Sequence, residues 1–565
     1  MAATISIGAQ SFEFLRTNHL FYVDKSDFIR EWWENSDAVT LITRPRRFGK
    51  TLNLNTTECF FSINYANRSD LFEGLSIWKS ESFRALQGTH PVIALSFASI
   101  KGTTFEAARE GILHLITKLY AAFSFLQDTE CLTPLDLEYF QSIHMSMSDT
   151  TAAMSIHSLS EYLNRYYGKK VLILLDEYDT PLQEAYVRGY WNEMADFIRS
   201  LFNATFKTNP FMERGLLTGI TRISQESIFS DLNHLELVTT TSEKYCTQFG
   251  FTEQEVFAAL DMFAMKDQQE TVRQWYDGFT FGSCTDIYNP WSITSFLDKK
   301  QLKPYWANSS SNQLISSLIQ QGAADIKMKM EDFLAGKQLD TEIDEEIRFS
   351  QLKRKHDAVW SLLLASGYLK IAGQSFCPNT GRYTYRLELT NREVHLMFED
   401  MILDWFSDDA VPYNDFLKAL LCNDVDYMNE YMNQVAELTF SSFDAGSSAS
   451  NRSHPERFYH GFVLGLIVEL AGRYQISSNR ESGFGRYDVM LKPLRQDDPA
   501  FVLEFKVNRT RKKASMEETM KETLKEALLQ IEEKHYDSEL IAHGISKDRI
   551  RHYGFIFDGK HVLIG

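Results

Sequence analysis

Long hydrophobic runs are absent from this sequence of 565 residues. A helix that crosses a bilayer needs about 20 consecutive apolar residues, and no run approaches that length. The first residues, MAATISIGAQSFEFLRTNHL, also lack the charged and then apolar pattern of a secretory signal. We therefore expect a cytoplasmic protein that does not enter a membrane.

Cysteine is scarce, and its few residues stand alone. None of them forms a CxxC pair, so neither a zinc knuckle nor a disulfide framework is indicated. We expect the thiols to be core residues. The six cysteines are Cys59, Cys131, Cys246, Cys284, Cys377 and Cys422.

An excess of positive charge is also lacking, since the net charge is -18. Binding of nucleic acid along the whole surface is therefore excluded, because phosphate contacts need clustered Lys and Arg. The charge is unevenly spread. Residues 451–565 contain 19 Lys and Arg against 17 Asp and Glu, a net of +2, which leaves -20 for residues 1–450. Any contact with DNA is expected in the C-terminal segment.

What the sequence does contain is the composition of a folded globular protein, with 44% hydrophobic and 24% charged residues. Its length predicts roughly three to four domains. In the N-terminal part, short apolar runs alternate with helical patterns, which is typical of parallel strands buried on both faces. An α/β layer is predicted up to about residue 230. The runs are Val39–Thr43, Pro91–Phe97, Val171–Glu177 and Arg214–Ile220.

The remainder of the chain predicts two further regions. Thr252 with Glu255 three residues later has the pattern of a capping box at a helix start. Between about 290 and 450 the pattern is mainly helical. Asp357–Gly373 leads into Arg382–Thr390 and then into a helix that starts at Asn391, and this order of helix, strand pair and helix suggests a winged-helix-like module. The Gly- and Ser-rich stretch Phe443–Glu456 is the best candidate linker. The predicted domains are 1–290 with a helical lid, 291–445 and 451–565.

A candidate phosphate-binding loop follows the first strand, at the start of the next helix. At a helix N-terminus, backbone N–H groups face a β-phosphate, Lys50 would reach the β- and γ-phosphates, and the Thr51 hydroxyl would ligate Mg²⁺. Gly49 precedes them, but Arg44 occupies the position of the first glycine in the pattern GxxxxGK[ST]. Taken alone, these residues could also form an ordinary turn from strand to helix.

A second motif supports the nucleotide hypothesis. Asp176 and Glu177 end a buried strand, so Asp176 would hold the Mg²⁺ shell and Glu177 would polarise the attacking water. The alternative is a carboxylate pair that caps the next helix. The following strand places Thr218, Thr221 and Arg222 at its C-terminal end, where ligands of parallel sheets bind. One of the three is expected to sense the γ-phosphate, with a plain loop role as the alternative.

A carboxylate pattern near the C-terminus predicts a second site. Asp488 begins one strand of a predicted hairpin, and Glu504 and Lys506 lie two apart on the other strand and so share a face. Two carboxylates suit Mg²⁺, which polarises a phosphate and activates a bound water. Lys506 would position that water or offset charge in the transition state. The alternative is an exposed cross-strand charge pair.

Several motifs together resemble the bacterial AAA-ATPase-like family, whose members carry a C-terminal PD-(D/E)XK nuclease domain. The resemblance spans nearly the whole chain. It implies an AAA-type P-loop sheet with ATP binding and hydrolysis, and a restriction-endonuclease-like α/β domain at the C-terminus that carries the D-x15-E-x-K signature. The motifs are FYVDKSDFI (Phe21–Ile29), TRPRRFGKT (Thr43–Thr51), LLDEYDTPL (Leu174–Leu182), LLTGITRIS (Leu216–Ser224), WYDGFTFG (Trp275–Gly282) and YNPWSI (Tyr288–Ile293).

The resemblance also implies roles for individual residues. Arg44 becomes a family trait, and Arg46 and Arg47 become candidate phosphate contacts, with solvated loop arginines as the alternative. In the C-terminal domain, Glu456 matches the early acidic residue and Gln530 a glutamine that some members place by the phosphate; a surface glutamine is the alternative. His460 is expected near this site, and the run Arg509–Lys513 could touch a DNA backbone or be a solvated loop.

Three functional hypotheses follow. In the first, ATP binding and hydrolysis control a Mg²⁺-dependent nuclease that acts on DNA. In the second, the chain is an ATP-dependent switch or binding module with a catalytically inactive nuclease-like domain. The third is an ATPase of defence or mobile-element biology whose tail recognises invading DNA. An oligomer is possible under each, because AAA-type sites are often completed by an arginine from a neighbouring copy.

Overall fold

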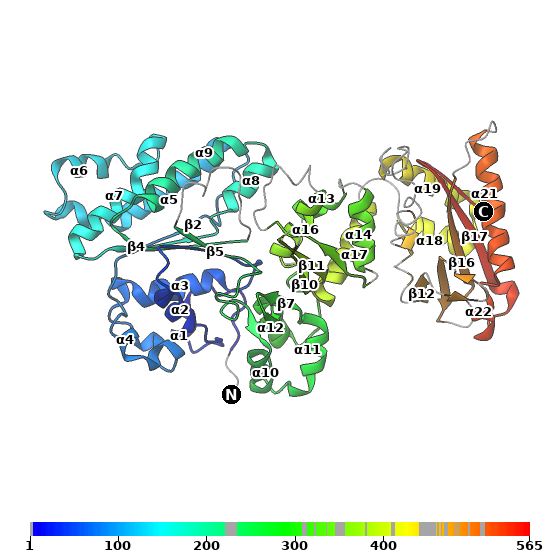
Figure 1. The fold of residues 1–565 in the computed structure, drawn as a ribbon, viewed down its shortest axis with the longest axis horizontal. Helices are drawn as coiled ribbons and strands as arrows, with labels where there is room; N and C mark the ends of the chain where they lie inside the picture. Colours follow the sequence, from blue (N-terminus) through cyan, green and yellow to red (C-terminus); the bar gives the residue numbers. More distant parts are fainter. Residues whose placement is uncertain are drawn as a thin grey trace. The chain divides into compact units, whose positions relative to one another are not determined.

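The computed structural model forms two compact units (Figure 1). Met1–Leu314 with Gln338–His395 form the first unit, and Ile315–Lys337 with Leu396–Gly565 form the second. The structure describes residues 4–565 except 221–233, 308–312, 321–323, 335, 345–355, 379–380, 408–412, 440–458, 460–462, 465, 468–469, 471–472, 479–480, 483–484, 487, 495–497 and 509–514. The predicted linker Phe443–Glu456 thus lies outside the described residues.

The first unit contains a five-stranded parallel sheet in the order β2-β3-β4-β1-β5. Every residue of β1 and β3 is buried, which explains their uninterrupted apolar sequences. All four predicted runs form strands, and β5 is an addition that the sequence analysis missed. The strands are β1 (Val39–Thr43), β2 (Val92–Ser96), β3 (Val171–Asp176), β4 (Met212–Gly219) and β5 (Leu235–Val238).

Helices cover both faces of this sheet (Figure 1). On one side lie α5 (Phe105–Ala122), α7 (Asp149–Tyr167) and α9 (Trp191–Phe202), and on the other lie α1 (Phe12–Thr17), α2 (Asp27–Asn35) and α3 (Lys50–Phe61). Aromatic side chains such as Trp32, Phe60 and Phe61 pack with strand residues in the core on the α3 side. The shorter helices are α4 (Glu81–Arg84), α6 (Pro134–Gln141) and α8 (Thr180–Arg188).

A helical segment with a small antiparallel sheet follows β5. The predicted capping box is confirmed, because the Glu255 N–H donates to Thr252 Oγ1 and the Thr252 N–H donates to Glu255 Oε2 at 2.7 Å. The sheet order is β6-β8-β7. The elements are β6 (Phe251–Thr252), α10 (Glu253–Met262), α11 (Gln269–Tyr276), β7 (Phe279–Phe281), β8 (Cys284–Tyr288) and α12 (Pro290–Lys299).

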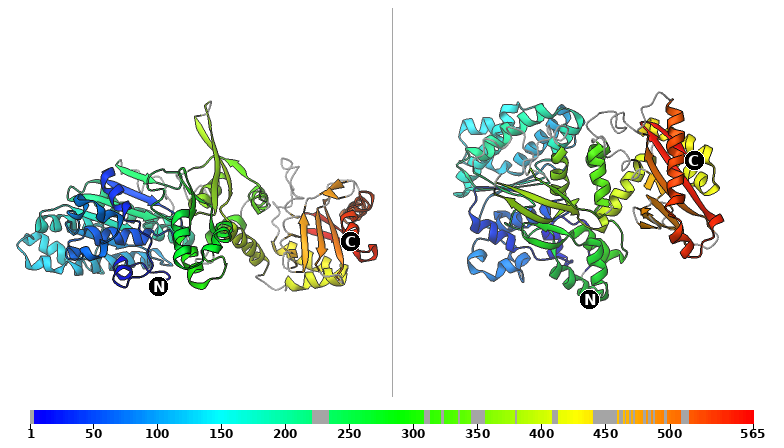
Figure 2. Two further views of the ribbon diagram at one scale, coloured as in Figure 1. Left: turned by 90° about the horizontal axis from the view of Figure 1, so that it is seen from below. Right: turned by 45° about the vertical axis from the view of Figure 1, so that its right-hand side comes forward.

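The middle region is mainly helical and contains the predicted order of helix, two strands and helix. A third strand, β9, pairs with β11, so the sheet order is β10-β11-β9. Figure 2 shows the β10–β11 hairpin projecting from its unit. The elements are α13 (Gln313–Gln320), α14 (Ala324–Leu334), β9 (Leu339–Thr341), α16 (His356–Ala365), β10 (Leu369–Cys377), β11 (Arg382–Leu389) and α17 (Arg392–Ser407).

The second unit is built on a mixed five-stranded sheet in the order β12-β15-β16-β17-β18. Strands β16 and β17 are parallel and the other pairs are antiparallel. The predicted hairpin is confirmed as β15 and β16, and the predicted helix from Met516 is α21. A tiny hairpin, β13 with β14, occurs where a loop was expected. The strands are β12 (Tyr474–Ser478), β13 (Glu481–Ser482), β14 (Gly485–Arg486), β15 (Val489–Pro493), β16 (Ala500–Val507), β17 (Ile550–Asp558) and β18 (His561–Ile564).

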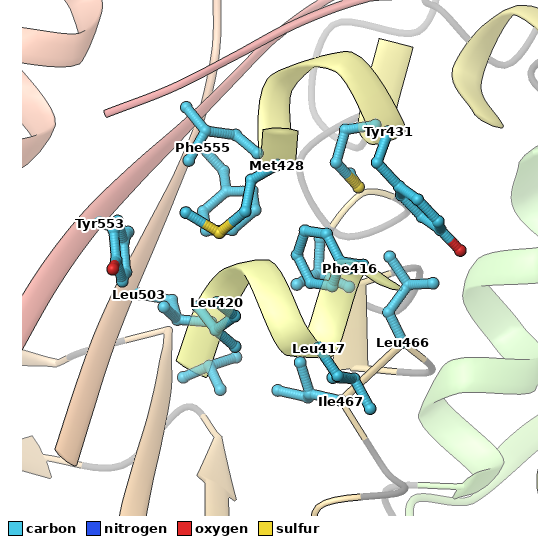
Figure 3. Packing of buried hydrophobic residues seen from close by; sticks show 14 of the residues in the cluster. Phe416, Leu417, Leu420, Met428, Tyr431, Leu466, Ile467, Leu503, Tyr553 and Phe555 are labelled. Carbon is cyan, nitrogen blue, oxygen red and sulfur yellow. The ribbon is translucent and has the colours of Figure 1, made fainter. Parts of the chain in front are cut away.

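Helices lie on both sides of this second sheet (Figure 1). Alternation along β16 sends Phe501, Leu503 and Phe505 into the cluster shared with α18 and α19, part of which Figure 3 shows. Val502 points the other way, into a cluster that includes Ile531 of α21. The same alternation puts Glu504 on the α21 side. The helices are α18 (Tyr413–Cys422), α19 (Val425–Thr439), α21 (Met516–Glu533) and α22 (Ser538–Ala542).

The cysteines differ from expectation. Cys246 and Cys284, 38 positions apart, form a disulfide. Cys59 is buried, but Cys131 and Cys377 are partly exposed and Cys422 is exposed, so the expectation of six core thiols is wrong. No local pattern announces a pair that only tertiary folding brings together. Among the described residues, no helix is both long and apolar enough to cross a membrane.

Candidate functional site

The loop between β1 and α3 has the conformation of an anion cradle. Arg47 and Gly49 both have positive φ, at 65° and 81°, and Gly49 is the N-cap of α3. Left-handed residues in so short a turn orient successive backbone N–H groups toward one point. The helix N-terminus directly behind adds further unpaired donors and its positive partial charge.

Lys50 lies inside this loop rather than in solvent. It is buried, and its Nζ donates to the Arg44 carbonyl at 2.9 Å and to the Pro45 carbonyl at 2.8 Å. Burial lowers the pKa of Lys50 to about 8, and the charges of Asp176 and Glu177 oppose that shift. The ammonium group is therefore within electrostatic reach of both carboxylates of the second motif.

The two nucleotide motifs meet at one edge of the sheet. Asp176 is buried at the end of β3, and its Oδ2 accepts a hydrogen bond from Thr51 Oγ1 at 2.7 Å. Its Oδ1 accepts from Thr218 Oγ1 at the end of β4. Because β4 pairs with both β1 and β3, it places Thr218 between the motifs. Thr218 is one of the three residues among which a γ-phosphate sensor was expected, and in the structure its hydroxyl donates to Asp176.

Two further carboxylates lie just beyond β3. Glu177 is half-buried, has a φ of 51°, and accepts from Thr180 Oγ1 at 3.1 Å. Asp179, which the sequence analysis did not single out, is buried and accepts from the Ile220 N–H at 2.9 Å. Its burial three residues after Asp176 was not detectable from the sequence. Thr221 and Arg222 lie outside the described residues.

Arg44 is a fully buried residue of the loop. Its guanidinium donates to the carbonyls of Thr43, at 3.0 Å, and Thr239, and it lies 4.5 Å from the centre of the Phe281 ring. A longer hydrogen bond of 3.4 Å reaches the Lys244 carbonyl. Burial lowers the pKa of Arg44 to about 9. The residue at the position of the first glycine thus ties the loop to the segment that follows β5.

Arg46 and Arg47 are exposed. Their exposure agrees both with phosphate contacts and with solvated loop arginines. The Arg47 guanidinium lies 4.3 Å from the centre of the Trp291 ring. The Arg46 carbonyl accepts from Asn289 Nδ2 at 3.2 Å and from Trp306 Nε1 at 2.9 Å. Asn289 and Trp291 of the YNPWSI segment thus contact the phosphate-binding loop directly. No sequence pattern predicts this contact.

The predicted C-terminal residues also come together, on the α21 side of the second sheet. Glu504 is buried, and its Oε1 accepts from Gln530 Nε2 and from Lys506 Nζ, the latter at 3.0 Å. Asp488 Oδ2 accepts from the Phe505 N–H at 2.8 Å. Four of the predicted residues thus lie close together at the C-terminal half of β16, namely Asp488, Glu504, Lys506 and Gln530. Glu456, His460 and the run Arg509–Lys513 lie outside the described residues.

Tyr536 belongs to the same cluster, and the sequence analysis missed it. Its hydroxyl accepts from Gln530 Nε2 at 3.0 Å, and the side chain is buried. Burial raises the pKa of Tyr536, and the charges of Glu504 and Asp488 raise it further. Tyr536 follows the end of α21, in a segment that turns back toward β16. No local sequence pattern predicts that turn.

The donor chemistry at both sites suits a hard divalent cation. The described residues contain no group of three or more His, Cys, Asp or Glu side chains that could hold a metal ion. Mg²⁺, however, is usually held by only one or two carboxylates together with water and phosphate oxygens. Thr51 with Asp176, and Asp488 with Glu504, supply oxygen ligands of that kind. The residues therefore fit Mg²⁺ at each site.

These two arrangements define the class of protein: a P-loop NTPase sheet in one unit and a nuclease-like sheet in the other. Residues 6–229 match the family described as Predicted AAA-ATPase, and residues 454–565 match the PD-(D/E)XK nuclease superfamily. The chain therefore contains an AAA-ATPase-like domain and a PD-(D/E)XK nuclease-superfamily domain, which confirms the resemblance. Its fold is the expected α/β combination, with a mainly helical middle region.

A curated relative extends over much of the chain. It is the protein named "Uncharacterized protein in vnfD 5'region" from Azotobacter chroococcum mcd 1, which is 25% identical over 401 residues. The match covers 71% of this chain and 70% of that protein. That name describes a gene neighbourhood and states no activity.

Proposed function

We propose that the first unit binds ATP with Mg²⁺ and hydrolyses it. The observation that carries this proposal is the hydrogen bond of 2.7 Å between Thr51 and Asp176, beside the buried Lys50. Thr51 and Asp176 hold the magnesium ion, and the N–H groups from Gly49 onward hold the β-phosphate. Arg46 and Arg47, both exposed at the loop, contact phosphate oxygens.

The hydrolytic step depends on charges that the fold brings together. Lys50 stabilises the negative charge that builds on the β- and γ-phosphates, and Glu177 orients the attacking water and accepts its proton. The magnesium ion, when bound, neutralises phosphate charge. Arg222, which follows β4 in the sequence, is proposed as the residue that senses the γ-phosphate. An arginine supplied by a neighbouring copy stays a prediction.

Substitution of Lys50 tests the nucleotide site. The variant Lys50→Ala should lose ATP binding in a titration with a fluorescent ATP analogue, because it removes the cation that reaches the phosphates. Lys118→Ala is the matched control, since Lys118 is exposed near the C-terminal end of α5 in the same unit. An unchanged affinity in Lys50→Ala would remove the nucleotide hypothesis.

For the second unit, the proposal is a Mg²⁺-dependent phosphodiester hydrolase acting on DNA. Support comes from the meeting of Glu504, Lys506 and Gln530 beside Asp488. Asp488 and Glu504 hold the magnesium ion, with Glu456 as a further acidic residue. Lys506 positions the attacking water, and Gln530 orients Glu504 and the phosphate. Residues 451–565 have a net charge near zero, whereas residues 1–450 are strongly negative, so DNA is expected to bind residues 451–565.

Cleavage of plasmid DNA with Mg²⁺ or Mn²⁺ tests this assignment. Asp488→Ala and Lys506→Ala should each abolish cleavage, because the first removes a metal ligand and the second a group that acts on the water. Lys521→Ala on α21 is the control, since that lysine is exposed and pairs with Glu517 along its own helix. Cleavage that continues unchanged in Asp488→Ala would reject the site.

The two activities are proposed to act together in the cytoplasm, with nucleotide binding and hydrolysis controlling cleavage. The second hypothesis, a switch or binding module with an inactive nuclease-like domain, has its own support. The Glu504 carboxylate is already engaged by Lys506 and Gln530 of its own domain. Under that hypothesis ATP turnover persists while no metal produces cleavage. Plasmid cleavage measured with and without ATP distinguishes the two.

A further inference from the structure

The disulfide between Cys246 and Cys284 joins two segments of the first unit that are far apart in sequence. Cys246 lies in the segment 239–250, which follows β5, and Cys284 is the first residue of β8. The Cα atoms are 6.1 Å apart, a usual spacing for a disulfide. Both cysteines are partly exposed, so a thiol reagent can reach the bond.

These same two segments both contact the phosphate-binding loop. The Arg44 guanidinium lies over the ring of Phe249, from the segment 239–250, and over the ring of Phe281, from β7, at 5.9 and 4.5 Å from their centres. Phe48, the residue before Gly49, is held in the same way. Its carbonyl accepts from the Gly250 N–H at 3.2 Å, and its ring packs on Phe281 at 5.4 Å.

The segment 239–250 also holds the helix that begins at Lys50. Asn53 Nδ2 donates to the Gln248 carbonyl at 2.8 Å, and the Thr239 carbonyl accepts from the Arg44 guanidinium. The segment is thus bonded to the residues before and after the loop. The disulfide links Cys246 to β8, which pairs with the strand β7 that contains Phe281. It therefore restrains both segments that contact the loop.

We infer that Cys246 and Cys284 form a reversible thiol–disulfide site that sets nucleotide affinity at the adjacent loop. This inference rests on the proposed function of that loop in binding ATP. In the reductive direction, a dithiol reductant attacks one sulfur, the S–S bond breaks, and a mixed disulfide forms. The second thiol of the reductant then displaces the bound sulfur. Two thiols remain on the protein, with the protons that the reductant lost, and the reductant leaves as its own disulfide. In the oxidative direction a small-molecule disulfide accepts the two electrons by the reverse exchange and leaves as two thiols.

The disulfide form is the one with higher nucleotide affinity. When the segment 239–250 and the β7–β8 pair are linked, the loop keeps its anion-binding conformation before ATP binds. Less conformational entropy is therefore lost on binding. Noncovalent contacts keep the reduced form folded, including the hydrogen bond of 2.9 Å from the Gly282 N–H to the Thr240 carbonyl and that of 2.6 Å from Ser283 to Glu243. Reduction should therefore weaken ATP binding without unfolding the unit.

The test uses the full-length protein in two states, oxidised and reduced with dithiothreitol. Peptide mapping by mass spectrometry establishes the Cys246–Cys284 link, and titration with a fluorescent ATP analogue gives the affinity. The oxidised protein should bind about tenfold more tightly, within the usual range of coupling between sites. Cys246→Ser and Cys284→Ser should bind weakly in both states. Cys422→Ser, which replaces an exposed free thiol, should retain the difference.

Hydrogen exchange of the amides of residues 44–53 provides a readout that does not require nucleotide. Exchange should be faster in the reduced protein and in Cys246→Ser. Equal exchange and equal affinity in the two states, with the link established, would overturn the inference, as would absence of the linked peptide after oxidation. Faster exchange without nucleotide binding in either state would instead reject the proposed ATP site while leaving the redox control of the loop supported.

Discussion

At the scale of single residues, Thr218 is a side chain that positions the Asp176 carboxylate. Its hydroxyl donates to Asp176, which also accepts from Thr51. A hydrogen bond to a charged group is worth about 1.5–3 kcal/mol, so losing it should misplace Asp176. Thr218→Val should lower ATP turnover by about tenfold to a hundredfold. ATP affinity should change much less, because Lys50 and the loop N–H groups are untouched.

Thr218→Ser is the control for this substitution, since it keeps the hydroxyl and loses only a methyl group. Steady-state phosphate release and a binding titration give turnover and affinity separately. If Thr218→Val turned over ATP as fast as the unchanged protein, positioning of Asp176 by Thr218 would be excluded. If the serine variant failed as well, the cause would be packing at the end of β4 rather than the hydrogen bond.

Sequence patterns predicted individual residues where the chemistry fixes their spacing. Lys50, Thr51 and Asp176 were predicted as site residues because a phosphate site needs a lysine and a hydroxyl at a helix start, and a carboxylate at a strand end. The hydrogen bond between Thr51 and Asp176 brings the two motifs together. The burial of Arg44 and the place of Tyr536 were missed, because each depends on neighbours distant in sequence. Arg44 lies against Phe281, and Tyr536 contacts Gln530 only through the course of the chain after α21.

At the scale of elements, α17 begins with a buried acid that makes stability depend on pH. Glu393 accepts hydrogen bonds from Ser292 of α12, at 2.9 Å, and from the Trp306 N–H at 2.6 Å. Burial raises the pKa of Glu393 to about 7, well above the value of a free glutamate. The folded state therefore binds this proton more tightly than the unfolded state does.

The sign of the pH dependence follows from that difference. Below the pKa of the unfolded state both states are protonated, and as the pH rises from about 4.5 to 7 only the unfolded state releases the proton. Glu393 should thus lower stability progressively across this window, by up to about 1.4 kcal/mol per pH unit. Glu393→Gln should remove this part of the dependence in thermal unfolding measured between pH 4.5 and 7.5. Parallel pH profiles for the two proteins would contradict the prediction.

Elements were predicted well when their own sequence carried the signal. The buried runs of β1 to β4 and the capping box of α10 are local patterns, and each was found. Strands β5 and β9, with four and three residues, are too short for a periodic pattern and are defined by pairing with β1 and β11. Pairing partners of that kind become visible only once the sheet is assembled.

At the scale of the whole molecule, the second unit extends beyond the part that matches the nuclease superfamily. That match begins at residue 454, yet α18 and α19 lie before it and cover one face of the sheet. In the disulfide and in this helical layer alike, segments that are distant in sequence contact one another within a domain. Seven large apolar side chains of the two helices are buried: Phe416, Leu417, Leu420, Met428, Tyr431, Met432 and Val435.

Two fragments test whether these helices are required. Residues 451–565 lack α18 and α19, so the apolar face with Phe501, Leu503 and Phe555 would lose the part of its cover that these helices supply. Burial of a large apolar side chain contributes about 1.5–3 kcal/mol, so seven such contributions are at least as large as a good part of the roughly 5–15 kcal/mol by which a typical domain is stable. The fragment 451–565 should therefore aggregate or remain unfolded, whereas 396–565 should give cooperative unfolding by circular dichroism. A stable, monomeric 451–565 would show that the sheet folds without its helical cover.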